Sequence, residues 1–240
     1  MMKNKQRVWI SLIFYVFVIT NTCKSQQTKS LNQEYTLNAI NNLNAFKSLS
    51  ALDSNKRMIK LNKRIKDIKL ELRYASVNNF MHREMYPPKT NFSFLRLPVV
   101  NALVKVQENL NQKGLGLKIF DAYRPYDVTK KFWELVHDER YVANPAKGSG
   151  HNRGTSVDLT IIELQTNQEL NMGTDFDNFT DSAHHSFTNF PKNILDNRIL
   201  LKQTMEQFGF IPLETEWWHY SWPNAERFEI LNLSFKELNN

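Results

Sequence analysis

The residues whose types and spacing could do chemistry are His151, Asp158, Glu216 and His219. His151 follows a glycine-rich stretch, and Asp158 lies seven residues later in a run of β-branched and aliphatic residues. An imidazole and a carboxylate are two of the three protein ligands of a catalytic zinc site, and His219 offers the third. Taken singly, His151 is better explained as a polar loop residue, and Asp158 as a charge at the edge of a strand. Their combination with Glu216, which stands beside two tryptophans and three residues before His219, favours a site.

Glu216 precedes His219 by three residues and is followed by Trp217 and Trp218. An apolar wall beside a carboxylate raises its pKa and suits it to proton transfer. The sequence therefore offers a general base close to the third candidate ligand.

Strands and helices must position these residues. Residues 156–164 and 215–222 have the composition of strands, and so do residues 65–75 and 117–122. Apolar spacing predicts helices over residues 98–112, 126–140 and 191–208. Helices and strands do not alternate regularly, so we expect an α+β fold: a small, mostly antiparallel sheet with helices packed on it and a single zinc site on the sheet.

A resemblance to a known family rests on several motifs in the same order. The pattern Ser149-x-His151-x-x-Gly154-x-small-x-Asp158, followed by Glu216-x-x-His219, resembles the D-Ala-D-Ala metallopeptidases, and most closely the D-alanyl-D-alanine dipeptidases. The resemblance runs from about Ile68 to Trp222. Other matching stretches are Leu72 to Phe80, Asp121 to Pro125, Met172 to Asp177 and Ala183 to His185.

The resemblance implies a role for each matching residue. One zinc ion per chain would be held by His151, Asp158 and His219, and Glu216 would be the general base. Arg124 would stabilise the oxyanion of the tetrahedral intermediate. Tyr74 and Asp177 match positions near the substrate amino group, and Ser149 matches one near the carboxylate. Without the resemblance, Arg124 would be explained as a surface arginine, Asp177 as a turn residue and Tyr74 as a core residue.

The expected activity is zinc-dependent hydrolysis of D-Ala-D-Ala or a related dipeptide. One alternative is a peptidoglycan D,D-carboxypeptidase or endopeptidase of the same superfamily. The Asn78-Asn79-Phe80 stretch and Asp177 would close the amino end of the pocket and favour the dipeptidase. A zinc-bearing binding module without catalysis is less compatible with the presence of Glu216 and Arg124.

The N-terminal residues have the pattern of an export signal. A basic stretch, Lys3 to Arg7, precedes an apolar run, Val8 to Thr20, that is shorter than a membrane span. We expect residues 1–22 to be a signal peptide, residues 23–60 a polar tether or accessory helix, and residues 61–240 the catalytic domain. Cys23 directly follows the signal and is a candidate for lipidation, although Thr20-Asn21-Thr22 matches the usual lipoprotein signal poorly. The protein is expected to be exported, either to the periplasm or as a membrane-anchored lipoprotein of a bacterium.

The formal net charge of +7 includes three charges of the leader. No run of lysine and arginine is interleaved with aromatic residues, so the pattern does not predict a nucleic-acid partner. A small dipeptide is the expected partner, with membrane attachment through Cys23 as an addition. The sequence leaves the oligomeric state open.

Overall fold

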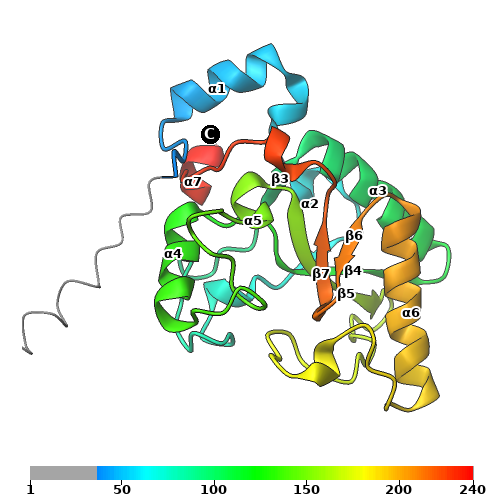
Figure 1. Ribbon diagram of the computed structural model, residues 1–240. Helices are drawn as coiled ribbons and strands as arrows, with labels where there is room; N and C mark the ends of the chain where they lie inside the picture. Colours follow the sequence, from blue (N-terminus) through cyan, green and yellow to red (C-terminus); the bar gives the residue numbers. More distant parts are fainter. Residues whose placement is uncertain (1–36, 240) are drawn as a thin grey trace, which may run out of the picture. The chain divides into compact units, whose positions relative to one another are not determined.

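The computed structural model describes residues 37–239, and the leader and Cys23 lie outside the described residues (Figure 1). The helices are α1 (Leu43–Leu52), α2 (Leu61–Arg64), α3 (Leu97–Asn111), α4 (Tyr126–Leu135), α5 (Gly150–Arg153), α6 (Lys192–Gln207) and α7 (Phe235–Leu238). The strands are β1 (Met58–Lys60), β2 (Lys69–Leu70), β3 (Phe94–Arg96), β4 (Leu115–Asp121), β5 (Ser156–Glu163), β6 (Ile211–Leu213) and β7 (Glu216–Ser221). Short 3₁₀ turns occur at Ser54–Lys56, Arg73–Ala75, Asp181–Ala183 and Ala225–Arg227.

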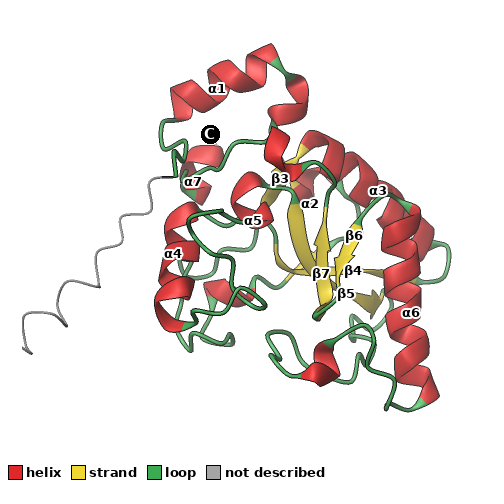
Figure 2. Cartoon of the chain, in the orientation of Figure 1, coloured by secondary structure: helices red, strands yellow, loops and turns green. Residues whose placement is uncertain are grey.

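A five-stranded sheet with the order β2-β4-β5-β7-β6 forms the centre of the fold (Figure 2). Only the short β2–β4 pair is parallel, and the other three pairs are antiparallel. Strands β1 and β3 form a separate antiparallel pair. The mixed α and β architecture expected from the sequence is therefore confirmed, and the sheet is mostly antiparallel.

Apolar side chains of the central strands and of α3 build the core. Leu117, Ile119, Leu159 and Ile161 are fully buried in β4 and β5. Pro98 occupies the first turn of α3, where its missing N–H costs no hydrogen bond. The apolar residues expected on one face of this helix are buried: Val99, Leu103, Val106 and Leu110. In Figure 1, α3 and α6 flank the sheet together, and α4 and α5 lie on its other side.

Two expected elements differ from the structure. The strand expected over residues 65–75 is wrong, because only Lys69 and Leu70 pair with β4, and Arg73–Ala75 form a 3₁₀ turn. Leu61, Ile65, Ile68 and Leu72 are buried at intervals of three and four residues, which is not the alternation of a strand. The helix expected over residues 126–140 ends at Leu135, and the following chain turns where Asp138 accepts hydrogen bonds from the backbone and side chain of Arg140.

Residues 37–60 belong to the same compact unit as the rest of the described chain. The weak helix expected there is α1, whose Phe46 is buried in the core. Ile40 forms a β-bridge with Leu231 near the other end of the chain. Between residues 37 and 239, no helix has the length and hydropathy that crossing a bilayer requires.

Candidate active site

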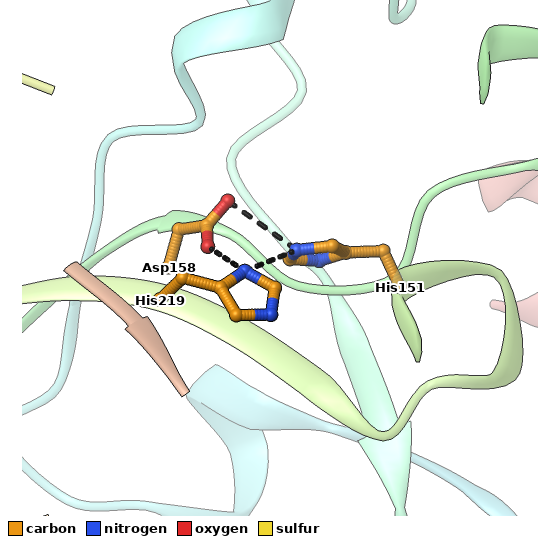
Figure 3. A group of neighbouring side chains, drawn as sticks. All are labelled: His151, Asp158 and His219. Atoms are coloured by element: carbon orange, nitrogen blue, oxygen red, sulfur yellow. Dashed lines mark hydrogen bonds and ion pairs between the residues drawn. The ribbon is translucent and has the colours of Figure 1, made fainter. Parts of the chain in front are cut away.

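Three neighbouring side chains come from three different elements. His151 lies on α5, Asp158 near the start of β5 and His219 on β7. Asp158 and His219 face each other in the antiparallel register of β5 and β7. One donor atom of each residue lies within 4.8 Å of the others (Figure 3). The structure thus brings together the three ligands predicted from residue type and resemblance.

His151 is held by a short helical turn where we expected a glycine-rich loop. Ser149 caps this turn, and its hydroxyl accepts a hydrogen bond from the backbone N–H of His151 at 3.1 Å. Gly154 ends the turn with a φ of 70°, a conformation that glycine adopts without strain. A Cβ on Gly150 would lie 2.0 Å from Oγ of Ser156, so glycine is needed for the turn to approach β5. The turn directs His151 inward, and its side chain is buried.

Outer hydrogen bonds fix the orientation of both imidazoles. Nδ1 of His151 donates to the carbonyl oxygen of Ala122 at 2.8 Å. Nε2 of His219 forms a hydrogen bond of 3.2 Å with Oγ of Ser221. Nε2 of His151 and Nδ1 of His219 face each other at 3.3 Å, so a cation placed between them could take a lone pair from each. Two converging lone pairs are the arrangement that a cation stabilises.

Asp158 supplies a carboxylate to the same point. Its Oδ1 lies 2.8 Å from Nδ1 of His219, and its Oδ2 lies 3.4 Å from Nε2 of His151. Burial alone would raise the pKa of Asp158, but the two imidazoles hold it well below its ordinary value. The side chain is therefore an ionised, buried carboxylate. Two imidazoles and one carboxylate are a donor set of catalytic zinc sites, so these residues fit that metal.

Glu216 lies at the start of β7 and points to the same region. Its Oε2 lies 3.9 Å from Nδ1 of His219, and the residue is 7% exposed. Burial, together with the negative charges of Asp158 and Asp177, raises the pKa of Glu216 well above its ordinary value. A carboxylate in this environment is a stronger base than one in water, which suits it to proton transfer.

Arg124 lies just after β4 and is held by Asp121. Its Nε and Nη2 donate to Oδ2 of Asp121 at 2.9 and 2.8 Å. The hydroxyl of Tyr86 donates to Oδ1 of the same carboxylate at 2.6 Å. The guanidinium lies over the rings of Phe132 and Tyr74, at 4.7 and 5.2 Å from their centroids. Burial alone would lower the pKa of Arg124, but Asp121 raises it, so the side chain is a fixed cation.

Tyr74 and Asp177 form a second pair in the site. The hydroxyl of Tyr74 donates to Oδ1 of Asp177 at 3.0 Å, and the backbone N–H of Phe80 donates to Oδ2 at 3.4 Å. Burial and the negative charge of Asp158 raise the pKa of Asp177 to about 7. The pair therefore offers an acceptor for a cationic group.

One cavity of about 220 Å³ joins these groups. Asp158 contacts both histidines but is not part of the cavity wall. The other seven residues predicted for the site line the cavity: Tyr74, Arg124, Ser149, His151, Asp177, Glu216 and His219. Aromatic side chains form much of the remaining wall, including Phe80, Phe132 and Phe179. The volume suits a small molecule with a polar group at each end.

The sequence did not predict the residues that hold the site from outside. Asp121, Tyr86 and Ser221 were assigned no role. Asp121 precedes Arg124 by three residues after a strand, and this spacing could have indicated an ion pair. Nothing in the sequence connects Tyr86 or Ser221 to the cavity. His82 and His137 are exposed and do not line the cavity.

The chain is similar in sequence to known peptidases. Residues 54–238 match the model of a family described as D-ala-D-ala dipeptidase. The D-alanyl-D-alanine dipeptidase of Escherichia coli (strain K12) is 33% identical over 165 residues, covering 69% of this chain and 84% of that protein. The D-alanyl-D-alanine dipeptidase of Enterococcus faecium is 28% identical over 178 residues, covering 67% of this chain and 88% of that protein.

Similarity to solved structures is more remote. The structure of VanYB in complex with D-Alanine-D-Alanine is 16% identical, covers 56% of this chain and 74% of that chain, and has a TM-score of 0.37. This likeness is too weak to carry an argument. The family match over most of the chain, together with the relative at 33% identity, confirms the resemblance seen in the sequence. The chain belongs to the D-Ala-D-Ala dipeptidase family and is a metallopeptidase.

Proposed function

We propose that this protein hydrolyses D-Ala-D-Ala, or a closely related dipeptide of D-residues, with the help of one zinc ion. The observation that carries the proposal is the hydrogen bond between Tyr74 and Asp177 in a small cavity that also contains His151, His219 and Glu216. An acceptor for an ammonium group beside a candidate metal site suits a substrate with a free amino end. The names of the family and of its relatives support the same substrate.

His151, Asp158 and His219 would hold the zinc ion. Zinc bound by three protein ligands keeps a coordination position for water or substrate and supplies Lewis-acid activation. The chain contributes the orientation of the ligands, through the hydrogen bonds of His151 to Ala122 and of His219 to Ser221.

Glu216 would move the protons of the reaction. Its carboxylate takes a proton from the attacking water and returns it to the nitrogen of the leaving amine. The raised pKa of Glu216 makes the carboxylate basic enough for the first transfer.

Arg124 would stabilise the negative charge that develops on the carbonyl oxygen. Its Nε and Nη2 are engaged by Asp121, and within the described chain no hydrogen bond occupies its Nη1. A cation that is fixed before the reaction stabilises a developing oxyanion without reorganisation. Asp121 therefore contributes by holding Arg124 in place.

The two ends of the dipeptide would be bound by different groups. Asp177, oriented by Tyr74, accepts hydrogen bonds from the ammonium group. The hydroxyl of Ser149 accepts from the backbone of His151, which leaves its hydrogen free to donate to the substrate carboxylate. An acylated peptide would bring an uncharged amide to Asp177, and this favours the dipeptidase over a carboxypeptidase or endopeptidase.

Steady-state assays on three substrates test the proposal. Purified, zinc-loaded protein should hydrolyse D-Ala-D-Ala with a higher kcat/KM than N-acetyl-D-Ala-D-Ala or a peptidoglycan pentapeptide. Extensive dialysis against a chelator should abolish the activity, and adding zinc should restore it. A higher kcat/KM on the pentapeptide would instead assign the protein as a D,D-carboxypeptidase. If none of the three substrates is hydrolysed, the proposed activity is wrong and a zinc-bearing binding module becomes the better assignment.

Export and lipidation of Cys23 remain a proposal that rests on the sequence alone, because these residues lie outside the described part of the chain. The basic stretch and the short apolar run before Cys23 support it. Mass spectrometry of the protein from native membranes should find an N-terminus near Cys23, and Cys23→Ser should abolish labelling by a fatty-acid probe. An intact Met1 or Met2 in the mature protein would refute export by cleavage.

A further inference from the structure

A buried arginine outside the cavity holds both ends of the segment that carries Asp177. Arg198 lies on α6 and is 5% exposed. Its Nε donates to the carbonyl oxygen of Met172 at 2.7 Å, Nη1 to that of His184 at 3.1 Å, and Nη2 to that of Ser182 at 2.9 Å. These three carbonyls lie near the two ends of residues 172–184, and Asp177 lies between them.

All the hydrogen bonds of this guanidinium go to the backbone of one segment. Among the described residues, no carboxylate forms an ion pair with Arg198, and its cationic group lies 4.8 Å from the centroid of the Phe190 ring. Burial lowers the pKa of Arg198 to about 10, which leaves the side chain charged at neutral pH. A buried cation bonded to three carbonyls fixes their relative positions, because the guanidinium fork is planar and rigid.

The segment has little regular structure that could hold it by itself. Only Asp181–Ala183 form a 3₁₀ turn, and Asp177 has a φ of 60°, which is uncommon for a residue with a side chain. Asn197, the neighbour of Arg198 on α6, donates from Nδ2 to the carbonyl oxygen of Asn171 at 2.9 Å. The ends of the segment are thus held by α6. Its middle contacts the site through the bond between Asp177 and Tyr74, and Phe176 packs beside it on Tyr74 and Trp218.

We propose that Arg198 is a positioning residue for amino-end recognition: by fixing residues 172–184 it places the carboxylate of Asp177 where the substrate ammonium group binds. This inference rests on the proposed function, in which Asp177 accepts the ammonium group. Lysine at position 198 keeps the charge but presents a single nitrogen, so it cannot hold three carbonyls at once. The segment would then shift, and Asp177 would lose its alignment with the substrate.

The test compares Arg198→Lys with the unsubstituted enzyme on D-Ala-D-Ala and on N-acetyl-D-Ala-D-Ala. We expect KM for the free dipeptide to rise about tenfold with a change in kcat of less than about threefold, the pattern of lost substrate binding. KM for the acetylated dipeptide and the zinc content should stay close to their original values. The preference for a free amino group should therefore fall about tenfold.

Leu201→Ala is the matched control on the same helix. Leu201 is fully buried, so its truncation lowers stability, but its side chain has no hydrogen bond to residues 172–184. We expect a lower Tm with an unchanged preference for the free amino group. If Arg198→Lys does not accumulate as folded protein, Asn197→Ala removes the neighbouring bond from a partly exposed side chain and should shift the preference in the same direction, by a smaller factor.

The outcomes separate the inference from the function on which it rests. If the unsubstituted enzyme shows no preference for the free dipeptide, the proposed function is wrong and the inference is wrong with it. If that preference exists and Arg198→Lys keeps it within about twofold, the inference alone is wrong. An equal loss of preference in Leu201→Ala would also overturn it, because general destabilisation would then explain the effect.

Discussion

Nε2 of His219 lies 3.2 Å from Oγ of Ser221, on the side of the ring that faces away from Asp158. When the hydroxyl accepts the proton of Nε2, the lone pair of Nδ1 is available for a metal ion beside Asp158 and His151. The hydroxyl of Ser221 is itself 2.8 Å from that of Ser156. Residues of both β5 and β7 therefore hold the ring of His219 in place. Such outer hydrogen bonds strengthen metal ligands by fixing their tautomer and direction.

Ser221→Ala should weaken zinc binding without preventing it. Loss of an outer-shell partner typically costs roughly 10- to 100-fold in metal affinity, and we expect the lower end because Asp158 still contacts His219. The affinity is measured by competition with a chromogenic chelator. Ser48→Ala, at an exposed position of α1, is the control and should bind zinc as tightly as the unsubstituted protein. Equal affinities for the two variants would contradict the role of Ser221.

Removal of zinc should lower the Tm as well as the activity. The metal binds only the folded arrangement of His151, Asp158 and His219, so saturating zinc adds to the free energy of unfolding. We expect the Tm to rise on adding zinc to the chelator-treated protein, and this rise to be absent in His219→Ala. The control is His137→Ala, whose side chain is exposed and lies outside the cavity. A zinc-dependent rise in His219→Ala would exclude His219 as a ligand.

The sequence predicted best those elements whose patterns are local. The helix over residues 98–112 and the strand over residues 156–164 match α3 and β5 within one residue at each end. In both, the apolar residues that define the period are the ones that the core buries. The strand predicted over residues 65–75 is wrong. Isolated isoleucines and leucines in a lysine-rich segment fit a strand and a series of turns almost equally well.

The candidate site was predicted in its chemistry but not in its support. His151, Asp158 and His219 were identified by type and resemblance, since ligand chemistry is visible in a sequence. Ser221, Asp121 and Arg198 act through partners that are distant in sequence or are backbone carbonyls, and neither kind of contact leaves a pattern of residue types. Their positions become evident only from the register of β5 and β7 and the packing of α6.

Glu216→Gln should abolish most turnover while keeping the metal. Glutamine has nearly the shape of glutamate but cannot accept a proton, and the loss of a general acid–base typically reduces kcat by roughly 10²–10⁴. Zinc content, measured in the same samples, should be unchanged because Glu216 is not proposed as a ligand. Glu214→Gln, two residues earlier and exposed, is the control and should retain full activity. Normal turnover by zinc-loaded Glu216→Gln would exclude Glu216 as the base.

Asp121→Asn should reduce activity through its effect on Arg124. The asparagine side chain can no longer form the charged pair with Nε and Nη2 of Arg124, so the guanidinium loses its fixed direction. We expect kcat/KM to fall about tenfold in Asp121→Asn. Arg124→Ala should have the larger effect, a loss of about 3 kcal/mol of transition-state stabilisation. Combining the two substitutions should cost no more than Arg124→Ala alone. Additive losses would mean that Asp121 acts independently of Arg124.

Substrate binding should depend on pH through Asp177. Burial and Asp158 raise its pKa from an ordinary value of 3.8 to about 7, so the neutral form predominates below pH 7 and the carboxylate above it. Only the carboxylate attracts an ammonium group, and KM for D-Ala-D-Ala should therefore fall as the pH rises through 7. At pH 6 only about a tenth of the protein would be competent to bind, which raises KM about tenfold over its value at the alkaline plateau.

Two controls isolate this titration of Asp177 from other effects of pH. N-acetyl-D-Ala-D-Ala has no ammonium group for Asp177 to attract. Its KM should therefore change little between pH 6 and pH 8. Asp177→Asn should bind D-Ala-D-Ala weakly at every pH in this range, whereas Asp175→Asn, at an exposed neighbouring position, should keep the original profile.

The same raised pKa of Asp177 means that its neutral carboxyl group favours the folded state below pH 3.8, and that this contribution is lost as the pH rises to about 7. In Asp177→Asn the free energy of unfolding should therefore decline less between pH 5 and pH 8, as measured by urea denaturation. A KM profile in Asp177→Asn that still falls through pH 7 would assign the titration to another group.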